Sequence, residues 1–169
     1  VIYPIVMGWQ WGGGWLAEIG FSDFAGSTLV HSTGGAAALA GIMLLGARNG
    51  RFDSAGNPKA LKPFAASSIP LVTIGVFILW LGWFGFNGGS QLALGTFEDA
   101  VAISTIFINT NLAACGGVLA AGIITRLMYG KTDVVQMLNG AIGGLVAVTA
   151  EPLAPSPFAA ILIGAVGGL

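Results

Sequence analysis

The sequence has 169 residues, of which 55% are hydrophobic and 8% are charged, and its net charge is -1. A soluble domain carries about 25% charged residues, so six basic and seven acidic residues are too few to cover a core of this size with a polar shell. The composition therefore predicts a protein embedded in lipid. The lack of a basic excess argues against nucleic acid as a partner.

The apolar runs predict an all-α, polytopic transmembrane helix bundle. A helical span needs about 20 largely apolar residues. In chain order we expect a partial helix in 1–15, full spans in 24–47, 69–87 and 100–128, a marginal span in 134–149 and a second partial helix in 157–169. The sequence lacks an initiator Met and both ends lie in apolar runs, so we expect one transmembrane domain, residues 1–169, truncated at both ends.

The charged residues sort by connection, which predicts the orientation. The acidic residues Glu18, Asp23, Glu98, Asp99 and Glu151 lie in the first, third and fifth connections. All six basic residues lie in or beside the second and fourth connections: Arg48, Arg51, Lys59, Lys62, Arg126 and Lys131. By the positive-inside rule these two connections are cytoplasmic.

Glycine and cysteine carry further information about the bundle. Many of the 28 glycines lie within the spans, including Gly34, Gly35, Gly41, Gly116, Gly117, Gly122, Gly140, Gly143 and Gly144. Small residues allow helix backbones to approach closely in lipid, so we expect a tightly packed bundle. Cys115 is the single cysteine, which predicts neither a disulfide nor a metal site.

Two ionisable residues near the second predicted helix are candidate functional residues. His31 follows Asp23 by eight residues, a rise of about 12 Å in a helix, which predicts a position near mid-membrane. An ionisable group there lines a pathway or pairs with a partner; the alternative is a neutral histidine hydrogen-bonded between helices. Asp23 is expected to cap the helix, and its charge at the outer mouth would also attract a cation.

Tryptophans gather toward the predicted outer side. Trp9, Trp15 and Trp80 are explained by an interfacial aromatic belt. Trp11 lies beside three glycines, which leave its indole face uncovered; such a face binds a cation by about 0.5 to 2 kcal/mol. Belt and binding site both remain open for Trp11. Asn109, Asn111 and Thr149 either line a cavity or form hydrogen bonds between helices.

Three motifs carry a resemblance to a known family. They are WGGGW at residues 11–15, DFAGSTLVHS at residues 23–32 and GWFGFNGGS at residues 82–90. In this order they resemble the ammonium transporter family (Amt/Mep), and the whole chain is similar to the family's fourth to ninth helices. Because Trp11 and Ser90 match the family's outer vestibule, the resemblance favours the Amt branch over the related Rh proteins.

The resemblance implies roles for individual residues. Trp11 and Ser90 would recruit ammonium at the outer vestibule, where the nearby acid Asp23 would assist its deprotonation, and ammonia would then pass through a hydrophobic pore lined by histidine. His31 would be the first of two pore histidines, with Trp83, Phe86 and Thr149 close to the pore. The second histidine and a phenylalanine gate would belong to segments outside this sequence.

The implied function is transport of ammonium or ammonia by a multi-pass protein of the plasma membrane. The alternatives are an ammonium-sensing receptor built on the same bundle, or an unrelated channel or structural membrane protein. No nucleophile–base set, metal-ligand cluster or phosphate loop is visible, so we expect no enzyme activity, cofactor or metal. The resemblance also implies a homotrimer and docking of a cytoplasmic PII-type regulatory protein.

Overall fold

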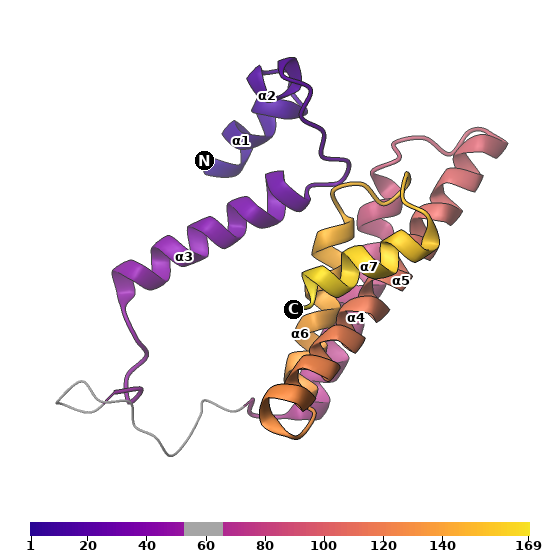
Figure 1. Ribbon diagram of the computed structural model, residues 1–169. Coiled ribbons are helices and arrows are strands. Elements are labelled where there is room, and N and C mark those ends of the chain that lie inside the picture. The colour runs from indigo at the N-terminus through magenta and orange to yellow at the C-terminus, as the bar shows by residue number, and fades with distance from the viewer. Residues whose placement is uncertain (53–65) are drawn as a thin grey trace.

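The computed structural model describes residues 1–52 and 66–169, and its regular elements there are helices (Figure 1). The predicted all-α fold is confirmed. Residues Lys59 and Lys62 of the predicted cytoplasmic connection lie outside the described residues. The elements are α1 (Ile2–Gln10), α2 (Trp15–Glu18), the π-helix η1 (Ser27–Ser32), α3 (Thr33–Leu45), α4 (Ile69–Gly89), α5 (Phe97–Tyr129), α6 (Val134–Val148) and α7 (Pro157–Gly167).

Three helical stretches of the described chain are long and apolar enough to cross a membrane. They are Ser27–Leu45, which joins η1 to α3, and the helices α4 and α5. These correspond to the three predicted full spans. Helix α6 has 15 residues, or about 22 Å, which is shorter than a hydrocarbon core of about 30 Å, as expected for a marginal span.

The four later helices each begin after a polar side chain that accepts a hydrogen bond from the first turn. Such caps satisfy backbone N–H groups that have no partner within the helix. The strongest is at α5, where Thr96 and Asp99 form a reciprocal capping box. The other caps are Ser68 before α4, Asp133 before α6 and Ser156 before α7.

The partial helix predicted in residues 1–15 is shorter than expected. Helix α1 ends at Gln10, and the chain turns through three glycines before α2 begins at Trp15. Gly13 has φ +73°, and the amide of Gly14 donates to the carbonyl of Gly8. Because glycine adopts left-handed conformations without a steric penalty, this run forms a turn and ends the helix.

Helices α5, α6 and α7 pack at backbone distance. A Cβ atom added to Gly117 would overlap the carbonyl of Gly140, and one added to Gly144 or Gly164 would overlap the carbonyl of Ala113. The expected close packing of glycine-rich helices is therefore present among these three helices. The glycines of α3 differ: Gly34, Gly35 and Gly41 have nothing within 4 Å of an added Cβ.

Helix α3 lies away from the bundle of α4 to α7, whereas the segment before η1 runs beside the connection between α6 and α7 (Figure 1). None of the residues of α3 is buried. Of the described helices, α4 to α7 therefore form a packed bundle, and the apolar helix α3 is attached to it through η1.

The ends of α5 lead to a prediction of topology. With 33 residues, α5 is about 50 Å long and can cross the bilayer completely. In a full-length Cys115→Ser background, a cysteine at Leu94 should react only with an impermeant reagent added outside, and a cysteine at Thr132 only with one added from the cytoplasm. Reaction of both sites from one side would contradict the assignment of α5 as a span.

Candidate functional site

The carboxylate of Asp23 organises the chain between α2 and η1. Its Oδ1 accepts hydrogen bonds from the amides of Gly26 (2.9 Å) and Ser27 (3.0 Å), and its Oδ2 accepts from Thr28 and Leu29 (both 2.8 Å). Asp23 is 2% exposed. A buried carboxylate is costly unless hydrogen bonds compensate it, and here four N–H groups at a helix N-terminus do so. Residues 23–29 are called the Asp23 turn below.

Gly26 makes the Asp23 turn possible. Its φ of +108° is left-handed, and an added Cβ would overlap the side chain of Val30 and lie 3.1 Å from Cη2 of Trp11. Residues 23–26 of the Asp23 turn are thus not helical, and the helical stretch begins at Ser27 as a π-helix. The predicted helical rise of about 12 Å from Asp23 to His31 is therefore wrong, because only the residues from Ser27 onward are helical.

Two backbone hydrogen bonds attach the Asp23 turn to the end of α6. The amide of Phe24 donates to the carbonyl of Ala150 (2.7 Å), and the amide of Ala25 donates to the carbonyl of Thr149 (3.1 Å). These bonds join residues more than 120 positions apart in the sequence. They connect the start of the first span to the α4 to α7 bundle.

Trp11 is oriented by the same turn. Its indole Nε1–H donates to the backbone carbonyl of Asp23 (2.7 Å), and its six-membered ring lies against Gly26. The side chain is 41% exposed. The indole is therefore held at a fixed angle while much of its surface stays open, an arrangement that the glycines at 12–14 alone did not reveal.

The ring of His31 packs against two aromatic side chains of α4. It is stacked on Trp83, with ring centroids 4.9 Å apart and planes 14° from parallel, and it meets Phe86 edge-on at 5.6 Å. Its Nδ1 lies 3.1 Å from the carbonyl oxygen of Gly26. Because a carbonyl can only accept, Nδ1 carries a proton in this geometry, and a neutral ring then presents Nε2 as an acceptor.

A buried polar network holds Trp83. Its indole Nε1–H donates to Oγ1 of Thr149 (2.8 Å), whose own hydroxyl lies 2.6 Å from the carbonyl of Leu145 and 3.2 Å from Oδ1 of Asn87. Asn87 in turn donates from Nδ2 to Oγ1 of Thr110 (3.0 Å). Thr149 is fully buried, so it supports the ring beside His31 through hydrogen bonds.

Phe86 and Ser90 lie on the more open side of α4. Phe86 is 40% exposed, and the hydroxyl of Ser90 donates to the backbone carbonyl of Phe86 (2.8 Å). The oxygen of Ser90 keeps lone pairs that can accept a further hydrogen bond. No hydrogen bond joins Ser90 to Trp11 or Asp23.

The remaining tryptophans divide into two groups. Trp9 and Trp15 are 39% and 53% exposed, with ring centroids 5.9 Å apart. Trp80, predicted for the same aromatic belt, is partly buried and packs against the buried cluster of Trp83, Ala114 and Leu145. Trp80 therefore contributes to packing inside the bundle.

Comparison with known proteins identifies the family. A sequence model of the Ammonium Transporter Family matches residues 1–169. The chain belongs to the ammonium transporter family. It is 46% identical over 178 residues to the ammonium transporter Amt2 of Archaeoglobus fulgidus, a match that covers 99% of this chain and 36% of that transporter.

Solved structures of this family have the same fold. A sensor Amt protein is similar with a TM-score of 0.90 and 37% identity, over 99% of this chain and 41% of that chain. Candida albicans Mep2 is similar with a TM-score of 0.84 and 34% identity, over 99% of this chain and 35% of that chain. This chain spans about a third of the length of the curated relatives it matches.

Sequence reasoning missed two residues that shape the site, Asn87 and Gly26, and it left two alternatives open for a third, Asn109. Asn87 lies inside the third motif, and an amide within an apolar span was a signal that it bonds to another helix. Gly26 follows an aspartate by three residues, a spacing compatible with a turn. Asn109 donates from Nδ2 to the carbonyls of Pro152 (3.0 Å) and Pro155 (2.8 Å), so its role is to hold the α6–α7 connection.

Removing the Asp23 carboxylate should unfold the turn. Asp23→Ala leaves four backbone N–H groups without their acceptor and should lower the free energy of unfolding by at least about 3 kcal/mol. Asp23→Asn keeps one acceptor oxygen and should lie between Ala and wild type. Thermal unfolding of the full-length protein in detergent measures both. Glu18→Gln, which removes an exposed carboxylate on the same side, is the control; equal effects of all three substitutions would contradict this role of Asp23.

Proposed function

We propose that the protein transports ammonium or ammonia across the membrane. Membership of the ammonium transporter family supports the substrate and the class of function. The observation that carries the mechanism is the Asp23 turn, which bonds directly to both Trp11 and His31. The same turn therefore contacts the exposed indole of Trp11, near the predicted outer side, and the half-buried imidazole of His31.

Ammonium is recruited at Trp11, with Ser90 as a second contact. The exposed indole offers a negative π face, which attracts a monovalent cation. The Ser90 hydroxyl oxygen can accept a hydrogen bond from ammonium. Asp23 contributes its negative charge and the shape of the turn, because both of its oxygens already accept amide hydrogen bonds; it is not expected to contact the cation.

His31 guides the substrate after the proton is lost. A bare monovalent cation near the centre of a bilayer costs several kcal/mol at least, whereas neutral ammonia does not carry this cost. Ammonium can release its proton to bulk water at the outer mouth, whereas potassium has no proton to release, so the requirement for deprotonation gives selectivity. The Nε2 atom of His31 supplies an acceptor for an N–H group, and Trp83 and Phe86 form the apolar walls beside it, with Thr149 behind Trp83.

An ammonium-sensing receptor is the second candidate function. The observation in its favour is the structural similarity to a protein described as a sensor Amt protein. Both functions use the same recruitment site, so they differ in whether substrate passes through. Ammonium flux into proteoliposomes distinguishes them: flux supports the transporter, and binding without flux supports the receptor.

The assembly and location are part of the same proposal. We place the protein in the plasma membrane as a homotrimer with one pore in each subunit, and we place the docking site for a PII-type regulator on the side of Arg126 and Lys131. The support for these statements is the family and the sorting of basic residues.

Substitution of Trp11 tests recruitment. Trp11→Leu removes the π face and should lower apparent ammonium affinity by roughly 2- to 30-fold, the range that corresponds to a cation–π contact. Trp11→Phe keeps a π face but loses the N–H donor and should lie between Leu and wild type. Flux at saturating ammonium should persist. Trp15→Leu is the control, and equal loss of affinity in Trp11→Leu and Trp15→Leu would exclude this role.

Substitution of His31 tests conduction. His31→Ala removes the acceptor and should abolish or strongly change ammonium flux in proteoliposomes of the full-length protein, while the protein still folds and inserts. Ser32→Ala, at the exposed neighbouring position, should leave flux unchanged. A folded His31→Ala variant with wild-type rate and selectivity would show that His31 has a structural role alone.

A further inference from the structure

One polar side chain of α5 holds the connection between α6 and α7. The Nδ2 group of Asn109 donates to the carbonyls of Pro152 (3.0 Å) and Pro155 (2.8 Å). Asn109 is fully buried, and its Oδ1 has no hydrogen-bond partner among the described residues. Turning the amide over would place that oxygen against two carbonyl oxygens, so the two N–H donors fix its orientation. Asn109 therefore acts in the described chain as a donor to the connection.

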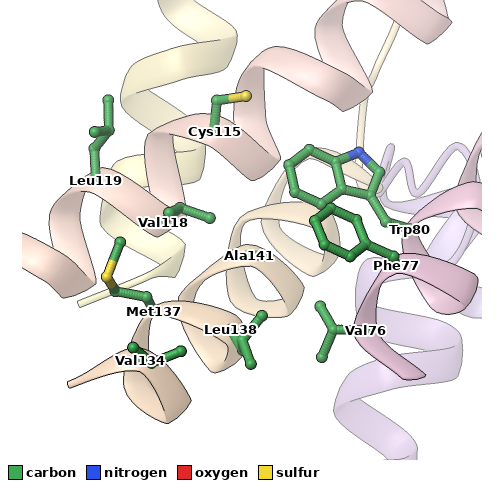
Figure 2. Close-up of a pocket in the computed structure, with 10 residues that line it drawn as sticks. All are labelled: Val76, Phe77, Trp80, Cys115, Val118, Leu119, Val134, Met137, Leu138 and Ala141. Carbon is green, nitrogen blue, oxygen red and sulfur yellow. The ribbon is translucent and has the colours of Figure 1, made fainter. Parts of the chain in front are cut away.

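Farther along α5, the contacts with α4 and α6 are made by apolar side chains. Figure 2 shows this region, where Phe77 and Trp80 of α4 line a pocket together with Val118 of α5 and Leu138 of α6. Apolar contacts are non-directional, whereas a hydrogen bond requires a defined distance and angle. The hydrogen-bonding residues of α5, which lie in its predicted outer half, therefore set the orientation of the segments that they bind.

A short and stiff piece of chain joins the Asn109 contact to the Asp23 turn. The carbonyls of Thr149 and Ala150 accept hydrogen bonds from the amides of this turn, and Pro152 lies two residues beyond Ala150. Two residues span at most about 7 Å. Pro152 has a fixed φ and also restricts the conformation of Glu151 before it. A hydrogen bond at the Pro152 carbonyl therefore constrains the direction in which the Ala150 carbonyl points.

Thr110, the neighbour of Asn109, supports the site by a different route. Its Oγ1 accepts a hydrogen bond from Nδ2 of Asn87 (3.0 Å). Oδ1 of Asn87 lies 3.2 Å from the hydroxyl of Thr149, which holds the indole of Trp83. Thr110 thus supports an aromatic ring, whereas Asn109 supports backbone carbonyls. Both residues are fully buried, so neither contact depends on segments outside this chain.

We propose that Asn109 is a positioning residue for ammonium recruitment. By holding the α6–α7 connection against α5, it directs two backbone carbonyls toward the Asp23 turn, which orients the indole of Trp11. This role rests on the proposed function, in which Trp11 recruits ammonium. The ring of His31 is held in addition by stacking on Trp83, so loss of the Asn109 bonds affects recruitment more than conduction.

Hydrogen exchange in the full-length protein measures this coupling without relying on transport. Asn109→Leu keeps nearly the same shape and removes both donors, so the amides of residues 23–29 should exchange about 5-fold faster, the factor that corresponds to one lost hydrogen bond. Thr110→Val is the matched control, because it also replaces a buried polar group by an apolar group of similar shape. It should leave exchange in residues 23–29 unchanged. Equal acceleration in both variants, or none in Asn109→Leu, would overturn the proposal.

Ammonium flux at varied concentration separates positioning from stability. Per folded protein in proteoliposomes, Asn109→Leu should lower the apparent ammonium affinity by roughly 2- to 30-fold, as expected for a displaced indole, and should change maximal flux less. Thr110→Val acts through Trp83 and should change maximal flux while affinity stays near wild type. Wild-type affinity in folded Asn109→Leu would show that Asn109 has a structural role alone. Wild-type protein that neither binds nor transports ammonium would contradict the proposed function, and the exchange data would still show whether Asn109 orients the turn.

A second variant decides the matter where Asn109→Leu does not fold. Asn109→Gln keeps both N–H donors and moves them outward by one methylene group, so it displaces the connection without leaving its carbonyls unbonded. Exchange in residues 23–29 and ammonium affinity should then lie between those of wild type and of Trp11→Leu or a turn without its bonds. Exchange and affinity equal to those of Thr110→Val would overturn the proposal.

Discussion

A single buried carboxylate determines how the first span of this chain begins. The two oxygens of Asp23 accept four amide hydrogen bonds, and this requires that Gly26 adopt a left-handed conformation. Without these bonds, a charge that is 2% exposed would have no compensation. The backbone carbonyls of the same turn bind Trp11 and His31. The positions of both proposed substrate contacts therefore depend on Asp23.

Thr149 connects this turn to the packed bundle in two ways. Its backbone carbonyl accepts from the amide of Ala25, and its hydroxyl accepts from the indole of Trp83, on which His31 stacks. The end of α6 thus supports the His31 imidazole in two ways. It bonds to the turn before the helix that carries His31, and it bonds to Trp83 of α4, on which the imidazole stacks. The glycine contacts between α5 and α6 hold that end in place, because a Cβ at Gly117 or Gly140 would separate the two helices. Close helix packing and the geometry of the site are consequently linked.

Hydropathy was enough to predict the spans, because length and composition alone decide whether a helix can cross lipid. The start of the first span was misplaced, because four hydrogen bonds to one side chain outweigh the helical preference of residues 24–26. Asn87 and Asn109 bond to groups that lie distant in sequence, and no local pattern identifies such partners. The motifs named Trp11, His31 and Trp83 as candidate site residues, whereas the burial of Thr149 and the stacking of His31 on Trp83 needed coordinates.

The conformation of the Asp23 turn, and not its charge alone, positions Trp11 and His31. Gly26→Ala tests this claim directly, since it keeps the Asp23 carboxylate but places a Cβ against Val30 and Trp11 at a left-handed φ. Gly20→Ala is the matched control, because Gly20 also has a positive φ of +82° but has open space around it. The measurement is ammonium flux per folded protein in proteoliposomes. We expect Gly26→Ala to lose both flux and ammonium affinity and Gly20→Ala to retain them; wild-type flux and affinity in folded Gly26→Ala would contradict this role of the turn.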